Sequence, residues 1–232
     1  LGLFPSTYAA AIAMRRSIGF KPIDDFAMIG LVNEFPYVIA THRDHAASSL
    51  SQLLKLRPPA PLLYGTPGQG TAQHLLMVQL GLKSGVEFRH VPFKGGPEVL
   101  NEVLAQRLDL IIDVPILLSE HIKSGTVRPL AVTTRERARD LPNVTTVAEV
   151  GPADFDVRGW MGLVAPAGVP EGTLRRLQDE VSSILADVSV ATRFAGLGVA
   201  AKTSSGADLQ ALLHTDLNRW GRVIADARIE RI

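Results

Sequence analysis

The residues best suited to chemistry lie in the glycine-rich stretch GTPGQGT (65–71), between an apolar run and an amphipathic run. Gly68 and Gly70 let the backbone turn tightly and let a ligand approach without a Cβ in the way. A strand that enters a helix through such a loop leaves N–H groups at the helix start, where the helix dipole favours anions. The stretch therefore predicts either an anion site or a simple turn that caps a helix.

Specific residues exclude three familiar motifs at this loop. A P-loop ends in Gly-Lys-Ser/Thr, whereas Gly70 is followed directly by Thr71, and the glycines have the spacing G-x-x-G-x-G instead of the dinucleotide-binding G-x-G-x-x-G. A nucleophile elbow has a serine between two glycines, and Gln69 occupies that place. The ligand class that remains is a carboxylate-sized anion.

Further polar residues fall near strand ends or helix starts. His74 could donate to a carboxylate or brace the loop, and a neutral imidazole is expected near a helix N-terminus. Asp113 ends an apolar strand, where α/β sheets present ligand residues, and would suit an amino group or a bridging water; it could equally cap the next helix. Ser6 and Thr7 follow a comparable strand, and they could likewise contact the ligand or only cap the following helix. The candidate ligand-binding residues are Ser6, Thr7, Gly68, Gln69, Gly70, Thr71, His74 and Asp113.

Composition excludes several function classes. The 232 residues contain no cysteine, so thiolate metal sites and cysteine nucleophiles are ruled out. The histidines show no metal-ligand spacing, and no two acidic residues share a strand end, so we expect no metal, no cofactor and no catalytic residue. The 24 basic and 23 acidic residues give a net charge of +1, which argues against nucleic acid as a partner.

Strand-like and helix-like segments alternate after residue 61, which predicts an α/β fold with a mainly parallel sheet. Three prolines within 57–61 predict a stiff connector that precedes these alternating segments. The predicted strands are 1–4, 26–32, 37–40, 62–65, 87–91, 108–114, 127–133 and an extended segment at 157–165. The first predicted helix follows Pro5, Ser6 and Thr7 and runs to about Arg16. The other predicted helices are 48–56, 72–82, 96–106, 117–123, 171–186 and 207–227.

Six ordered motifs resemble the Bug family, the TctC-like extracytoplasmic solute receptors of tripartite tricarboxylate transporters. The resemblance covers essentially the whole chain. The motifs are GTPGQGTAQHL (65–75), HVPFKGG (90–96), RLDLIID (107–113), HIKSGTVRPLAVTT (121–134), LPNVTTVAEVG (141–151) and GWMGLVAPAGVP (159–170).

The resemblance implies a type II periplasmic-binding-protein fold of two lobes, each a mostly parallel sheet flanked by helices. Residues 1–61 and 164–232 would form the first lobe and residues 62–163 the second. The lobes would close on a small carboxylate: a di- or tricarboxylate, an acidic amino acid or an aromatic acid. Such a receptor is not an enzyme. It is periplasmic, and it presents its ligand to membrane permease subunits or signals through a sensor kinase.

Two features depart from the family pattern. Family members begin with a strand and a glycine-rich loop that this sequence lacks, so we expect an incomplete first lobe whose exposed sheet edge favours dimerisation. Phe93 stands where the family usually has a tyrosine, which removes a hydroxyl. The sequence also shows no signal peptide, and no apolar stretch approaches the roughly 20 residues of a membrane span.

Two alternative functions remain open. One is the effector-binding domain of a transcription regulator, which would need DNA-binding helices upstream. The other is an enzyme that processes a carboxylic acid with His74 and Asp113.

Overall fold

The computed structural model describes residues 1–56 and 60–232. Contacts divide the chain into two compact units. Unit 1 consists of Leu1–Phe35 with Gly159–Ile232, and unit 2 of Pro36–Arg158. Among the described residues, no helix is both long enough and apolar enough to cross a bilayer.

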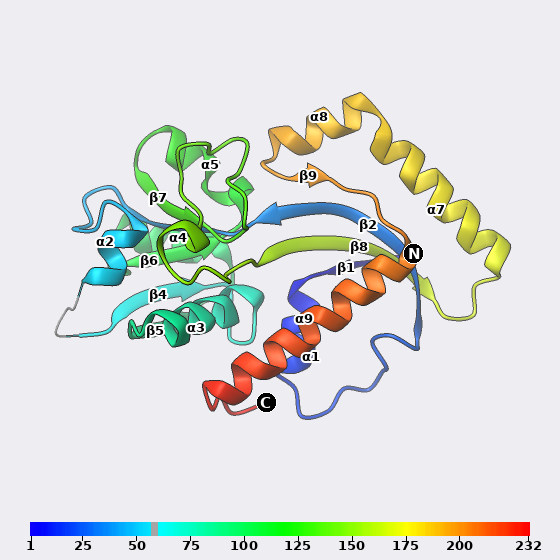
Figure 1. Ribbon diagram of the computed structural model, residues 1–232, viewed down its shortest axis with the longest axis horizontal. Coiled ribbons are helices and arrows are strands. Elements are labelled where there is room, and N and C mark those ends of the chain that lie inside the picture. The colour runs from blue at the N-terminus through cyan, green and yellow to red at the C-terminus, as the bar shows by residue number, and fades with distance from the viewer. Residues whose placement is uncertain (57–59) are drawn as a thin grey trace. The chain divides into compact units, whose positions relative to one another are not determined.

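Unit 2 contains a five-stranded sheet in the order β5-β4-β6-β3-β7 (Figure 1). The sheet is mixed, because β4 pairs in parallel with β5 and β6, whereas β3 lies antiparallel between β6 and β7. Its strands are β3 (Val38–His42), β4 (Leu62–Thr66), β5 (Phe88–Pro92), β6 (Leu110–Asp113) and β7 (Val127–Val132).

Three helices of unit 2 follow directly from three parallel strands. α3 (Ala72–Ser84) follows β4, α4 (Gly96–Leu104) follows β5, and α5 (Pro115–Lys123) follows β6. The starts of all three helices therefore lie at the edge of the sheet where the parallel strands end, which is where such sheets bind ligands. The unit also contains the short helices α2 (Leu50–Lys55) and α6 (Val147–Val150).

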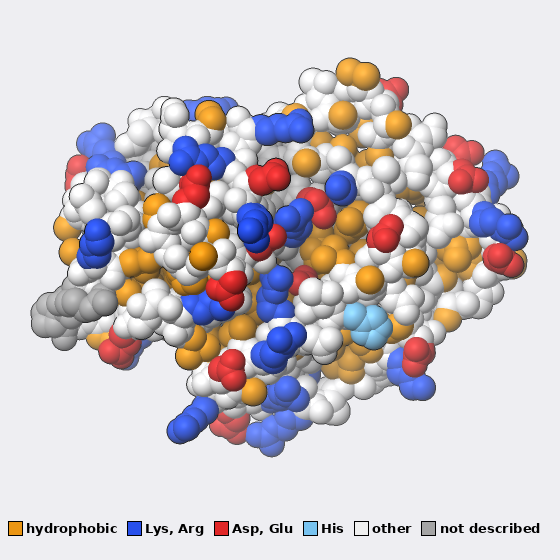
Figure 2. Space-filling model, viewed as in Figure 1, with side chains coloured by type: hydrophobic (Ala, Val, Ile, Leu, Met, Phe, Trp, Pro, Cys, Tyr) orange, Lys and Arg blue, Asp and Glu red, His pale blue; other side chains and the backbone are white. Residues whose placement is uncertain are grey.

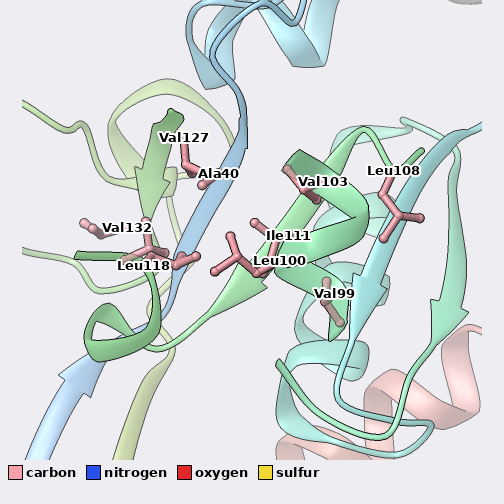
Figure 3. Packing of buried hydrophobic residues seen from close by; sticks show 10 residues of the cluster. Ala40, Val99, Leu100, Val103, Leu108, Ile111, Leu118, Val127 and Val132 are labelled. Carbon is pink, nitrogen blue, oxygen red and sulfur yellow. The ribbon is translucent and has the colours of Figure 1, made fainter. Parts of the chain in front are cut away.

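One hydrophobic core cluster of unit 2 packs α4 and α5 against the sheet (Figure 3). Val99, Leu100 and Val103 lie on one face of α4 and are buried against the strands. At Gly65 a Cβ would overlap the side chains of Val99 and Leu108. The first glycine of the GTPGQGT stretch is thus required by packing, since it lets α4 approach β4.

Unit 1 is built on a four-stranded sheet in the order β1-β8-β2-β9, and β1–β8 and β2–β9 are antiparallel pairs. Its strands are β1 (Gly2–Pro5), β2 (Phe26–Pro36), β8 (Arg158–Pro166) and β9 (Ala200–Ala201), with β2 and β8 each crossing the unit boundary by one residue. Its helices are α1 (Thr7–Ala13), α7 (Glu171–Ala186), α8 (Val188–Gly196) and α9 (Gly206–Asp226).

A buried hydrogen bond ties β8 to α9 within unit 1. Trp160 Nε1 donates to Asp216 Oδ2 over 2.8 Å, and both side chains are buried. Burial raises the pKa of the Asp216 carboxyl, and the Trp160 bond opposes that rise. This one donor therefore offsets part of the cost of burying the carboxylate.

Unit 1 exposes hydrophobic side chains on α7 and α8. Ile184 is 56% exposed and Val188 is 79% exposed, and α8 has no buried residue. Figure 2 shows hydrophobic side chains over these two helices, while acidic and basic side chains are mixed across the visible face. That mixture agrees with the net charge of +1.

The structure confirms the α/β class and the division into units with helices flanking a sheet, but both sheets are mixed. The prediction of mostly parallel sheets is wrong because β3 and the paired strands of unit 1 run antiparallel. The long helices at 171–186 and 207–227 form as expected, within one residue at each end.

The boundaries of the units differ from the predicted lobes. Residues 36–56 belong with unit 2, because β3 is hydrogen-bonded between β6 and β7. Residues 159–163 belong with unit 1, because β8 pairs there with β1. Residues 57–59 of the predicted connector lie outside the described residues. The chain passes between the units at Phe35/Pro36 and at Arg158/Gly159.

Candidate functional site

The glycine-rich loop of unit 2 joins β4 to α3 through residues 67–71. Gly68 has φ of 142° and Gly70 has φ of 77°, both in the region that only glycine occupies readily. Thr71 is the N-cap of α3: its hydroxyl accepts from His74 N at 3.3 Å and donates to Gly68 O at 2.8 Å. The Thr71 side chain therefore serves as the cap of α3.

Two loop amides are already used by side chains of the same unit. Gly68 N–H donates to Thr66 Oγ1 at 3.3 Å, and Gly70 N–H donates to His74 Nδ1 at 3.2 Å. These two glycines therefore shape the loop, and their N–H groups are directed to internal acceptors.

Four other amides at the start of α3 are unpaired. Within the described part of the chain, the N–H groups of Gln69, Thr71, Ala72 and Gln73 have no hydrogen-bond acceptor. They belong to the loop, the N-cap and the first two helical positions, where a helix leaves its donors free. Since the helix dipole adds partial positive charge here, the set is suited to an anion.

His74 is buried, with 6% of its surface exposed, and burial lowers its pKa to about 4. Because Nδ1 accepts from Gly70, the proton of the neutral ring is on Nε2. His74 thus braces the loop, as one reading of the sequence had it. Whether Nε2–H also reaches a ligand stays a prediction.

His90 is a second histidine of the site that sequence analysis did not single out. Its ring stacks on that of His74 with centroids 4.1 Å apart. Burial and the proximity of His74 lower the pKa of His90 to about 3. Thr66 Oγ1 contacts His90 Nε2 at 2.6 Å and donates to Gly68 O at 3.0 Å. Both rings are therefore neutral at pH 7 and act as polar braces without supplying positive charge.

Asp113 ends β6 and is only 4% exposed. Its Oδ1 accepts from Val114 N–H at 2.8 Å and from Gln73 Nε2 at 3.4 Å. Oδ2 has no partner among the described residues, and a Cβ on Gly96 would overlap it. Burial raises the pKa of this carboxyl to about 6. The first turn of α3, the start of α4 and the start of α5 thus all touch one buried acid.

Gln73 is the residue that sequence reasoning missed most clearly. It is 5% exposed, and its Oε1 has no partner in the described structure. Its position in the first turn of a helix after a glycine-rich loop was visible, but nothing in the sequence indicated that its side chain would contact Asp113. Strand pairing set that contact, since β4 and β6 lie side by side in parallel.

Ser6 and Thr7 lie in unit 1, at the end of β1 and the start of α1, as expected. Ser6 is buried and its N–H donates to Trp160 O at 2.8 Å. Contact of these two residues with a ligand stays a prediction. Among the residues that the structure describes, no group of three or more His, Cys, Asp or Glu side chains could hold a metal ion.

Comparison with solved structures defines the class. The chain is similar to R. palustris Rpa4515 with adipate, at 26% identity and a TM-score of 0.89, covering 99% of this chain and 78% of that one. It is similar to the periplasmic binding protein BugD at 27% identity and a TM-score of 0.86, covering 98% and 78%. The chain has the type II periplasmic-binding-protein fold.

The family follows from the sequence match. The model of the tripartite tricarboxylate transporter family receptor (TctC) matches residues 1–229, so the chain belongs to that family.

Two curated relatives are longer than this chain. It is 32% identical to the UPF0065 protein in the tcbD-tcbE intergenic region of Pseudomonas sp. (strain P51), over 88% of this chain and 62% of the relative. It is 30% identical to the UPF0065 protein in the TAR-I ttuE-ttuC' intergenic region of Agrobacterium vitis, over 94% and 65%. The chain thus spans less than two thirds of the length of each.

Proposed function

We propose that this chain is a solute-binding receptor that captures a small carboxylate for a tripartite tricarboxylate transporter. The observation that carries the proposal is the set of four unpaired amides at Gln69, Thr71, Ala72 and Gln73. Membership of the receptor family supports it. The adipate in the structure of the similar R. palustris protein supports a dicarboxylate in particular.

The energetics of such a site are sufficient for a transport receptor. A hydrogen bond from an amide to a carboxylate contributes about 1.5–3 kcal/mol. Three or four of them reach the roughly −8 kcal/mol of micromolar binding after ordering costs are met. The neutral histidines add no charge, so affinity depends on the amides and the helix dipole.

The proposal assigns separate roles to the candidate residues. The N–H groups of Gln69 and Thr71, with those of Ala72 and Gln73, bind the carboxylate, and Gly68 and Gly70 give the loop its shape. His74 holds the loop and keeps Nε2–H available. In unit 1, Ser6 and Thr7 are proposed ligand contacts on the strength of their place at the end of β1.

We propose binding without turnover. His74 Nδ1 is occupied by Gly70 N–H, so this nitrogen is not free to act as a general base. The enzyme alternative predicts that a bound carboxylic acid is consumed. Incubation of the protein with each candidate acid, followed by NMR, separates the two, because a receptor returns the acid unchanged.

The proposed partners and place in the cell follow the family. Its solved members include periplasmic binding proteins, and we propose that this chain acts in the periplasm and delivers its ligand to membrane permease subunits or to a sensor kinase. We also propose self-association through unit 1. β1 is an edge strand, and Leu3 on it is 52% exposed, which favours pairing with a second copy.

Calorimetry tests the central claim. The protein is titrated with succinate, adipate, citrate, aspartate, glutamate and benzoate at pH 7.5. Binding of at least one of these at micromolar affinity is expected. If none of them binds more tightly than about 1 mM (a binding free energy near −4 kcal/mol), the proposed function is wrong. Size-exclusion chromatography with light scattering tests self-association separately.

A further inference from the structure

Two buried side chains of unit 2, Asp113 and Gln73, each keep one oxygen atom without a donor. Asp113 and Gln73 are 4% and 5% exposed, and Gln73 Nε2 donates to Asp113 Oδ1 at 3.4 Å. Asp113 Oδ2 and Gln73 Oε1 both lack partners among the described residues. A buried acceptor without a donor is costly, so these two oxygen atoms require an explanation.

The same glutamine belongs to the proposed anion site. Its backbone N–H is one of the four unpaired amides, while its side chain touches Asp113. A carboxylate bound at this amide would therefore lie beside a second, buried carboxylate. A second negative charge beside Asp113 would raise the pKa of this carboxyl further and so favour its neutral form.

We propose that capture of a carboxylate at the start of α3 is coupled to the uptake of one proton by Asp113. The inference rests on the proposed function of this site. The free receptor has Asp113 ionised. It takes up one proton and one ligand anion, and in the resulting complex Asp113 is a neutral carboxylic acid. The buried charge of the site is then unchanged by binding.

A neutral Asp113 also suits the unpaired oxygen better. Oδ2 has no donor among the described residues, and burying a neutral carboxyl group that lacks a partner costs less than burying a charged carboxylate that lacks one.

Asp113 is the group best placed to take this proton. Burial has already raised its pKa to about 6, and the groups that oppose the rise are the neutral Val114 amide and the neutral Gln73 side chain. The first turn of α5 carries no acidic residue, and Glu98 in the first turn of α4 is exposed and accepts from Lys94 N. His74 on α3 and His90 on β5 are also titratable neighbours of the anion site, and their lower pKa values place them further from protonation at neutral pH.

The test is calorimetry of carboxylate binding at pH 7.5 in phosphate and in Tris, buffers with very different ionisation enthalpies. Adipate is titrated first, then the other acids of the panel above. The difference between the two observed enthalpies gives the number of protons taken up. We expect close to one, because a group of pKa about 6 is almost fully ionised at pH 7.5 before the ligand arrives. Because binding consumes a proton, the affinity for the ligand should also fall by up to about tenfold for each pH unit between 6.5 and 8.5.

Two variants assign the proton. Asp113→Asn, which has the same shape and cannot titrate, is expected to abolish the uptake and to make affinity independent of pH. Glu98→Gln removes an exposed acid at the start of α4 and is expected to leave both the uptake and the pH dependence as in the wild type. Circular dichroism confirms that both variants are folded.

The outcomes separate the inference from the function beneath it. If no acid of the panel binds the wild type, the proposed function fails and the inference falls with it. Binding without proton uptake overturns the inference alone. Uptake that persists in Asp113→Asn also overturns it, and assigns the proton to His74 or His90.

Discussion

Removal of one amide from the start of α3 tests the anion site directly. Ala72→Pro deletes the N–H of Ala72, one of the four unpaired donors. Ala72 is the first residue of the helix, a position where proline is common because the missing N–H has no helical partner. Thr71 before it has φ of −73° and ψ of 161°, the extended conformation that a residue before proline prefers. The backbone thus accommodates the change.

The expected loss follows from the single bond removed. A charge-assisted hydrogen bond contributes about 1.5–3 kcal/mol, so the dissociation constant should rise roughly 10- to 150-fold. Ala72→Ser is the control, because it changes the side chain at the same buried position and keeps the N–H; its dissociation constant should stay within about threefold of wild type.

Titration calorimetry of both variants gives the comparison, and thermal unfolding establishes that each is folded. If Ala72→Pro is folded and binds within threefold of wild type, then the Ala72 amide does not hold the carboxylate. The reasoning from unpaired donors would be refuted at this residue. An equal loss in Ala72→Ser would instead attribute the effect to crowding at the helix start.

Three further predictions concern stability, each measured by urea denaturation. Gly65→Ala should destabilise unit 2 by about 1–3 kcal/mol, because the added methyl overlaps Val99 across the β4–α4 packing. Asp113→Asn should stabilise the protein by up to about 3 kcal/mol at pH 7.5. The reason is that the pKa of Asp113 is about 6 in the folded protein and near 3.8 in the unfolded chain. The protonated carboxyl therefore favours folding below pH 3.8, and this contribution is lost as the pH rises through 6. The gain of the variant over wild type should therefore shrink towards zero as pH falls from 7 to 4, and a constant difference would contradict it. Trp160→Phe should cost about 1–3 kcal/mol by leaving Asp216 without its donor, whereas a neutral result would show that water replaces the indole.

The regular part of the fold was predictable because its signals are local. Alternating apolar runs and turns after residue 61 indicated β4, α3, β5, α4, β6, α5 and β7 in order. The place of β3 was not predictable in this way. Its partners Val127 to Val132 are some ninety residues away, and no periodicity within a strand says which distant strand it will join.

The candidate site shows the same limit. The loop and its free helix donors followed from glycines and a threonine at fixed spacing, which are local features. The partners of those groups did not follow. Neither the acceptance of Gly70 N–H by His74 nor the contact of Gln73 with Asp113 could be read from spacing. The latter contact depends on how neighbouring strands bring helix starts together.

The internal hydrogen bonds of the glycine-rich loop have a consequence for how the protein meets its ligand. Thr66 and His74 hold the loop through hydrogen bonds within the protein, so the conformational entropy of the loop residues is lost during folding and not again when a ligand binds. Association with the ligand should then be fast, because the loop is already in its binding conformation. Substitutions at Thr66 or His74 would make the loop more mobile and lower the affinity for the ligand, even where the substituted side chain makes no contact with it.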